Sequence, residues 1–332
     1  MTRAATPEST AVDEEEPDSA RPGRGSVLLR SLGRRLVRTL LVIWGAITAI
    51  FFLQKLSGDP VRLMLPDLAT QEQIDAVTAD LGLDQPVIVQ YGRFLLRFVQ
   101  GDFGTSYKQR RPVTEIVLER LPATLELTLA ATVIALVVGT LMGTYAATLR
   151  RRLGDKFVGV LALLGQSVPT FWLGIVAILI FAVYLQWFPA SGRGGLEHLV
   201  LPACTLAAFS VAKTTRIARA SMIESLSSDY VQTARAKGLS PGRVIGIHAL
   251  KNSSISIVTV TAFMFSTLMG GALVTEVVFA WPGIGQLMVQ GVLSRDFPVV
   301  QGAVFVVSLI VVLTYMLLDI IYTFLDPRLR KG

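Results

Sequence analysis

The chain alternates between long apolar runs and short polar segments. Each run spans 18 to 30 predominantly apolar residues, and an α-helix needs about 20 to cross the hydrocarbon core of a bilayer. The runs cover residues 36–53, 125–149, 157–186, 198–220, 255–281 and 299–325. The pattern predicts an all-α, polytopic membrane protein with six transmembrane helices.

The third run is the longest and is interrupted by polar and helix-breaking residues. Gln166, Ser167 and Pro169 lie near its middle. Because proline removes a backbone hydrogen bond inside a helix, this sequence predicts a kink that neighbouring groups must satisfy. The kink is either a packing bend or a wedge that faces a pore.

The charges between the runs predict the topology. Basic residues follow the second run, the fourth run and the sixth run, whereas Arg193 and Arg295 are the basic residues of the loops after the third and fifth runs. Short loops rich in Lys and Arg stay in the cytoplasm. We therefore expect both termini to be cytoplasmic and residues 57–121 to be external.

The pattern divides the chain into four parts. Residues 1–33 are rich in Ala, Pro, Glu and Ser without apolar periodicity, which predicts a disordered cytoplasmic tail, and 34–56 form the first membrane helix. Residues 57–121 form an external segment, and 122–332 form a core with the other five membrane helices.

Two helices are expected in the external segment. Thr70 and Gln73 have the spacing of a capping box, and Gly82 suits the end of the helix that follows. A second helix over 86–99 has Tyr91 and Phe94 on one face. The segment is thus either a small helical cap on the bundle or a solvated linker.

Composition and charge narrow the function. Of 332 residues, 52 % are hydrophobic and 17 % are charged, with a mean hydropathy of +0.56, which argues against a soluble enzyme. The excess of basic residues that gives the net charge of +7 lies in the predicted cytoplasmic loops, so it indicates no nucleic-acid surface. One cysteine, two distant histidines and the absence of a phosphate-binding loop predict no catalytic site, no metal site and no cofactor bound by this chain.

The polar segment between the fourth and fifth runs predicts a short helix at about 228–238. Ser228 can cap the first amides, Asp229 and Arg235 complement the helix dipole, and Gly238 suits the left-handed position after the helix. Its face of Tyr230, Val231 and Ala234 would be exposed in the cytoplasm unless a partner covers it. The alternative is a helix that lies on the membrane surface.

Here the sequence resembles a known family. Residues 229–240, followed by 248–252, resemble the EAA loop of permease subunits of bacterial ABC importers, and more closely the B-type permease of dipeptide and oligopeptide transporters. Gln232, Thr233 and Ala234 occupy the Glu-Ala-Ala positions, so the acidic residue of the wider pattern is missing. The other matching motifs are Gly58-Asp59-Pro60, Leu81-Gly82-Leu83-Asp84-Gln85-Pro86, Gly101-Asp102-Phe103-Gly104-Thr105-Ser106, Glu119-Arg120-Leu121-Pro122-Ala123-Thr124-Leu125-Glu126, Ser167-Val168-Pro169-Thr170-Phe171-Trp172, Phe279-Ala280-Trp281-Pro282-Gly283-Ile284-Gly285, Arg295-Asp296-Phe297-Pro298 and Asp326-Pro327-Arg328.

The resemblance implies a type I ABC importer fold and a set of partners. These are a second homologous permease, two ABC ATPase subunits or one fused subunit that bind ATP and Mg, and an extracytoplasmic solute-binding protein, assembled in the inner membrane. The helix over 228–238 would be the coupling helix that docks on an ATPase. Its residues are Asp229, Tyr230, Val231, Gln232, Thr233, Ala234, Arg235, Ala236, Lys237 and Gly238.

A translocation path is expected along the fifth run. Small and hydroxylated side chains recur there at helical spacing, which suits either a peptide passage or close helix packing. Glu276, near the outer end, is a candidate for an external gate or for contact with a charged peptide terminus. The candidate residues are Ser167 in the third run and Thr259, Phe263, Ser266, Gly270 and Glu276 in the fifth.

One other class of transporter is kept as an alternative. A secondary transporter driven by an ion gradient would need charged relays at the bilayer midplane and inverted repeats, and neither is clear in this sequence. The leading prediction is therefore a permease subunit of an ATP-driven peptide importer.

Overall fold

The computed structural model describes residues 33, 37, 40, 41, 43–45, 47–49, 51, 52, 55, 61, 70–80 and 82–325. The predicted tail, apart from Gly33, and much of the first predicted membrane helix lie outside the described residues. The chain divides into a unit of residues 1–41 and a unit of residues 42–332. In the first unit the described residues are helical.

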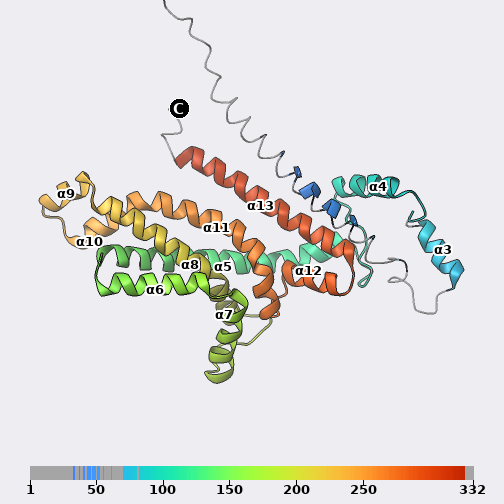
Figure 1. Ribbon diagram of the computed structural model, residues 1–332, viewed down its shortest axis with the longest axis horizontal. Helices are drawn as coiled ribbons and strands as arrows, with labels where there is room; N and C mark the ends of the chain where they lie inside the picture. Colours follow the sequence, from blue (N-terminus) through green and yellow to red (C-terminus); the bar gives the residue numbers. More distant parts are fainter. Residues whose placement is uncertain are drawn as a thin grey trace, which may run out of the picture. The chain divides into compact units, whose positions relative to one another are not determined.

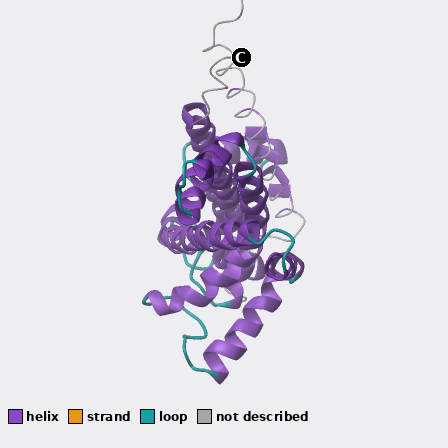
Figure 2. Cartoon of the chain, turned by 90° about the vertical axis from the view of Figure 1, so that its left-hand side faces the viewer, coloured by secondary structure: helices purple, strands orange, loops and turns teal. Residues whose placement is uncertain are grey.

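The second unit is helical, as predicted (Figure 2). Within the described residues, the β-structure is one isolated bridge between Thr105 and Pro112. Two helices lie in the predicted external segment, α3 (Gln71–Asp80) and α4 (Val87–Val99). The predicted capping box starts α3, because the Thr70 amide donates to Gln73 Oε1 (3.0 Å) and the Gln73 amide to Thr70 Oγ1 (3.4 Å).

Among the described residues of this unit, four helices are long and apolar enough to cross a membrane, and all four coincide with predicted spans. They are α5 (Val113–Thr148), α8 (Leu196–Leu226), the continuous stretch of α10 (Pro241–Arg243), η2 (Val244–Ala249) and α11 (Leu250–Val278), and α13 (Phe297–Leu325). Helix α5 begins 12 residues before its predicted apolar run. Its first turns carry Glu115 and Glu119 outward while Val113, Ile116 and Val117 are buried.

The long third run is broken rather than kinked. Helix α6 (Leu153–Ser167) ends before Pro169, and α7 (Thr170–Ala177) starts after it and continues into the π-helix η1 (Ile178–Tyr184). The two halves meet at 105°. Val168 takes an extended conformation, as expected for a residue before proline. The described residues thus contain four continuous candidate spans and one bent helix pair that together has the length and composition of a span.

Helices α5, α6, α8 and α11 lie side by side (Figure 1), and small residues let α5 and α8 approach closely. A Cβ atom on Gly139 would lie 2.7 Å from Thr214 Cβ, and one on Gly143 would lie 2.5 Å from Ala218 Cβ. Gly139 and Gly143 form a Gly-x-x-x-Gly motif, which membrane helices use for close packing. The sequence analysis did not single out this motif.

A second core forms at the other end of α5. Val113, Ile116 and Val117 pack against Ile284 and Leu287 of the short helix α12 (Ile284–Leu293), with Val299 and Ala303 of α13 completing the cluster. Helix α12 is too short to cross a bilayer. This cluster therefore fixes α12 and the start of α13 against α5.

Candidate coupling helix and translocation path

The predicted short helix between the fourth and fifth spans is present as α9 (Asp229–Ala236). It ends in a Schellman motif, because the Gly238 amide donates to the Arg235 carbonyl (2.9 Å) and the Leu239 amide to the Ala234 carbonyl (3.3 Å). Gly238 has a φ of 77°, the left-handed conformation predicted for it. The helix therefore ends at a defined position.

Ser228 occupies the N-cap position, but its side chain does not cap α9. The hydroxyl instead donates to the Ser225 carbonyl (2.6 Å), one of the terminal carbonyls of α8. The prediction that it caps the first amides is wrong, because α8 ends just before α9 and offers a terminal carbonyl at hydrogen-bonding distance. The Val231 and Gln232 amides donate to the backbone carbonyl of Ser228 (3.1 and 3.2 Å).

The apolar face of α9 is covered by this chain itself. Val231 is 0 % exposed and Ala234 is 6 % exposed, and both pack with Val244 of η2, Leu226 and Leu239. The expectation that these two side chains face the cytoplasm is therefore wrong, because η2 folds back under α9. The surface that α9 presents, here called the α9 outer face, consists of Asp229, Tyr230, Gln232, Thr233, Arg235, Ala236 and Lys237.

Helix α9 is joined to two spans at once. Leu226 is the last residue of α8, and Val244 belongs to the helical stretch that continues into α11. The same two spans are tied by a hydrogen bond of 2.9 Å between the Ser225 and Ser253 hydroxyls. Figure 1 shows α9 and α10 at one end of α8 and α11. A displacement of α9 would thus be transmitted to both spans.

The candidate path residues lie at different depths of the fold. Gly270 is exposed, and no atom of the described part of the chain lies within 4 Å of the position that its Cβ would take. Ser266 is 5 % exposed, and Phe263 packs against Tyr315 with ring centroids 5.7 Å apart and the ring planes tilted by 44°. Thr259 is half-buried, and Ser167 is exposed, with its hydroxyl donating to the Leu163 carbonyl (2.9 Å). In this chain alone, Gly270 and Ser167 are accessible, and Ser266 belongs to the packed side of α11.

Glu276 is enclosed by polar groups at the start of α12. It is 0 % exposed, and its carboxylate accepts hydrogen bonds from the Thr124 hydroxyl (2.6 Å) and the Gln286 amide (3.0 Å). The Ile284 amide donates to Thr124 Oγ1 (2.8 Å). A contact between Glu276 and a peptide terminus would require this cluster to open.

Other polar contacts fix the predicted external loops. Asp296 is 3 % exposed and accepts hydrogen bonds from the Ser106 hydroxyl and from the Tyr107 amide (3.1 Å). Arg193 pairs with Glu126 (2.6 Å). Arg111 pairs with Glu119 and, more weakly, with Glu115; the hydrogen bond to Glu119 is the largest of the effects that raise the pKa of Arg111 above its ordinary value.

On the side of α9, the bundle contains an ion pair that the sequence analysis missed. Asp155, near the start of α6, accepts two hydrogen bonds from the Arg219 guanidinium of α8 (2.6 and 2.7 Å). The pair places Arg219 against a side chain that is only 8 % exposed. The sequence separation of 64 residues hides this pair from any local pattern.

The described residues contain no group of three or more His, Cys, Asp or Glu side chains that could hold a metal ion. The geometry at α9 and along α11 is that of a helical bundle with a short surface helix, built from small, apolar and backbone-bonded groups.

Comparisons with known proteins agree with this geometry. Residues 139–331 match the family model "Binding-protein-dependent transport system inner membrane component", and residues 28–128 match the model of its N-terminal region. A protein of Brucella abortus (strain 2308), named "Putative peptide transport system permease protein", is 41 % identical over 313 residues, covering 92 % of this chain and 99 % of that protein.

A glutathione transport system permease protein of Salmonella paratyphi A is also 41 % identical, over 304 residues, with 92 % of this chain and 98 % of that protein covered. Among solved structures, a chain of the MetNI methionine ABC transporter in inward-facing conformations superposes with a TM-score of 0.55 at 18 % identity, covering 64 % of this chain and 96 % of that chain. That likeness supports the fold. The chain belongs to the family of inner-membrane components of binding-protein-dependent transport systems.

Proposed function

We propose that this chain is the permease subunit of an ATP-driven importer of short peptides. The substrate class rests on the two relatives at 41 % identity, whose names refer to peptide and to glutathione transport. Glutathione is itself a tripeptide, so both names point to the same chemical class. Family membership favours this function over the ion-gradient alternative.

The proposed assembly contains a second permease, ATPase subunits that bind ATP and Mg, and an external binding protein. We place both termini in the cytoplasm, because the loops that carry α9 and the Arg150-Arg151-Arg152 cluster are the basic ones. The exposed side of α11 around Gly270 would then face the second permease across the translocation path.

The observation that carries the coupling proposal is the double attachment of α9. Its inner face packs on the end of α8 and on the start of the α11 stretch, while its outer face is free of contacts within the described residues that would cover it. A rigid helix joined to two spans suits a device that converts closure of the ATPases into movement of the path. The α9 outer face would dock on the ATPase.

The test is ATPase activity of the assembled transporter in membranes. Tyr230→Ala with Arg235→Glu changes the α9 outer face without touching the buried Val231 and Ala234, and we expect it to abolish stimulation by binding protein and peptide. Arg295→Glu, the same charge reversal on an exposed arginine in a predicted external loop, is the matched control and should keep stimulation. Normal stimulation in the α9 variant would refute the coupling role, and peptide uptake that follows an ion gradient without ATP would refute the importer assignment.

A further inference from the structure

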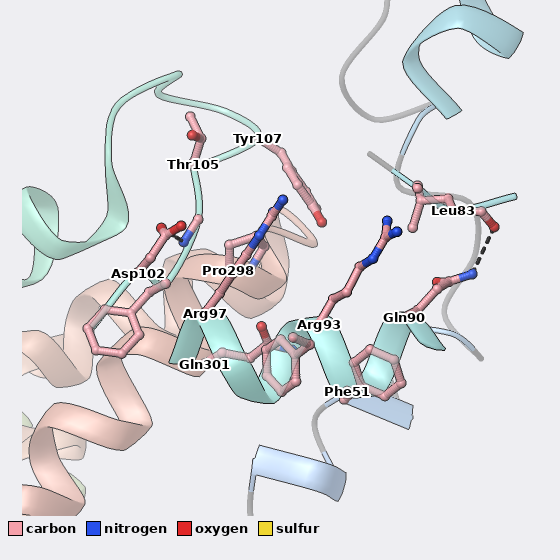
Figure 3. A pocket seen from close by; sticks show the side chains of 14 residues that line it. Phe51, Leu83, Gln90, Arg93, Arg97, Asp102, Thr105, Tyr107, Pro298 and Gln301 are labelled. Atoms are coloured by element: carbon pink, nitrogen blue, oxygen red, sulfur yellow. Dashed lines mark hydrogen bonds between the residues drawn. The ribbon is translucent and has the colours of Figure 1, made fainter. Parts of the chain in front are cut away.

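A cavity of about 320 Å³ lies beside α4 (Figure 3). Its walls come from α4, from the loop that contains Asp102 and Tyr107, and from the start of α13 at Pro298 and Gln301. Phe51, in the first predicted membrane helix, closes one side. The cavity therefore lies where the external segment meets the ends of two membrane helices.

Two arginines extend into this cavity from one side of α4. Figure 3 shows the Arg93 and Arg97 side chains rising from neighbouring turns toward the space next to Tyr107. Among the described residues, neither guanidinium has a carboxylate within ion-pairing distance. A Cβ atom at Gly82 would lie 2.9 Å from Arg93 Nη1, so the glycine makes room for this side chain. With one carboxylate, Asp102, the cavity has an excess of positive charge.

Helix α4 has three distinct faces. Tyr91, Phe94 and Phe98 form an aromatic face that packs on Phe51 and, through Phe98, on Phe305 of α13. Gln90, Arg93 and Arg97 form the polar face that lines the cavity. The third face is aliphatic and exposed: Ile88, Leu96 and Val99 are 76 %, 62 % and 87 % exposed. Exposed aliphatic side chains beside these two arginines indicate an environment that is both apolar and anionic.

The contact between Phe98 of α4 and Phe305 of α13 indicates how deep α4 lies in the membrane. Phe305 lies eight residues after the start of α13, or about 12 Å along its axis at 1.5 Å per residue. The 29 residues of α13 extend about 44 Å, roughly 14 Å more than the hydrocarbon core. Even if all of this excess is external, Phe305 lies at the edge of the hydrocarbon. Phe98 and the adjacent Arg97 are then at the level of the lipid headgroups or below it.

We propose that Arg93 and Arg97 bind the phosphate of an anionic phospholipid of the outer leaflet, with the acyl chains against Leu96 and Val99. Guanidinium groups bind phosphate oxygens in a bidentate geometry, which an ammonium group does not match. A soluble anion would explain the arginines but would leave the aliphatic face in water. The inference does not depend on which solute the protein transports.

The test measures the lipid retained by the full-length chain in its assembled transporter. The protein is reconstituted in bilayers of phosphatidylcholine and phosphatidylglycerol in equal amounts, extracted in mild detergent, and analysed for bound lipid by mass spectrometry. We expect retained phosphatidylglycerol in the wild type and an approximately tenfold loss of that preference in R93Q/R97Q. K108Q/R295Q removes two exposed positive charges from predicted external loops outside the cavity and should retain the lipid.

A second pair of measurements separates the lipid from other anions. Leu96→Ser with Val99→Ser should weaken retention although both arginines remain, and inorganic phosphate should not raise the unfolding temperature as phosphatidylglycerol does. Unfolding in phosphatidylcholine alone confirms that each variant folds. Equal retention in R93Q/R97Q, or equal stabilisation by inorganic phosphate, would overturn the proposal. If R93Q/R97Q keeps the lipid but loses affinity for the external binding protein, the cavity receives an acidic side chain of that protein instead.

Discussion

The Glu276 carboxylate accepts a 2.6 Å hydrogen bond from the Thr124 hydroxyl, joining α11 to α5 in the buried region next to α12. Together the two side chains accept the amides of Gln286 and Ile284 at the N-terminus of α12. Gly283, at the N-cap position, has no side chain to do so. Side chains from two other helices therefore provide the cap of α12 by accepting its first free amides.

Replacing Thr124 by Val should destabilise this region. Valine keeps the shape of threonine but leaves the Ile284 amide without an acceptor and removes a donor to Glu276, and each unsatisfied buried group costs about 1–3 kcal/mol. The measurement is thermal unfolding of the purified transporter. Thr124→Ser, which keeps the hydroxyl, is the control and should unfold near the wild-type temperature. Equal unfolding temperatures for the Val and Ser variants would show that the hydroxyl does not cap α12.

A side chain at Gly143 should disrupt the packing of α5 on α8. The Cβ atom would meet Ala218 Cβ at 2.5 Å and the Thr215 carbonyl oxygen at 2.6 Å, and the backbone of α8 cannot move aside locally. Overpacking of this kind costs about 1–3 kcal/mol or more. Gly143→Ala should lower the unfolding temperature and the yield of assembled protein. Gly270→Ala has open space for its Cβ and should change neither.

A large side chain at Gly270 tests the translocation path separately from the fold. Gly270→Leu places a bulky group on the exposed side of α11, where no atom of the described residues lies within 4 Å of the Cβ position. We expect normal insertion and unfolding temperature for this subunit, with a loss of peptide uptake or of assembly with the second permease. Uptake assays in proteoliposomes and co-purification of the partner distinguish these two results. If Gly270→Leu shows wild-type uptake and assembly, Gly270 lies neither in the path nor in the interface.

The continuous spans could be predicted from the sequence because each is an uninterrupted local signal. Helices α8, α11 and α13 lie where the apolar runs indicate. The left-handed conformation of Gly238, with a φ of 77°, could be predicted because a glycine follows a short helix-forming segment. The capping box at Thr70 and Gln73 is likewise local. These features depend on residues within one or two turns of each other.

The contacts that position the candidate site could not be predicted in this way. Burial of Val231 depends on Val244, which reaches it only because η2 folds back. The pairs Glu276–Thr124 and Asp155–Arg219 join residues 152 and 64 positions apart. The sequence shows Glu276 as a charge in an apolar run, but its partner is set by helix packing, which no periodicity in one segment records.

The Asp155–Arg219 pair should contribute to the packing of α6 on α8. The carboxylate is 8 % exposed, so Asp155→Ala leaves the guanidinium without its partner, and loss of one member of a buried pair costs about 3–5 kcal/mol. Arg219 is itself more than a third exposed, so water compensates in part and we expect a smaller loss. Arg219→Lys should keep part of the stability that the pair contributes, since lysine keeps the charge without the two-pronged contact. A double-mutant cycle on the unfolding temperature tests whether the two side chains stabilise the fold as a pair. If the effects of the single substitutions simply add, the pair makes no such contribution.

The two faces of α9 should respond differently to the same substitution. Val231→Asp buries a charge among Leu226, Leu239 and Val244, so α9 should detach from α8 and η2. Protease sensitivity of the 225–252 segment should then increase, and ATPase stimulation should be lost as a consequence. Gln232→Asp, at the adjacent exposed position, should leave protease sensitivity unchanged. If stimulation is also lost in Gln232→Asp, the outer face contacts the ATPase directly. If both variants show the same protease sensitivity, the inner face does not hold α9 to the spans, and the coupling route through Val231 is wrong.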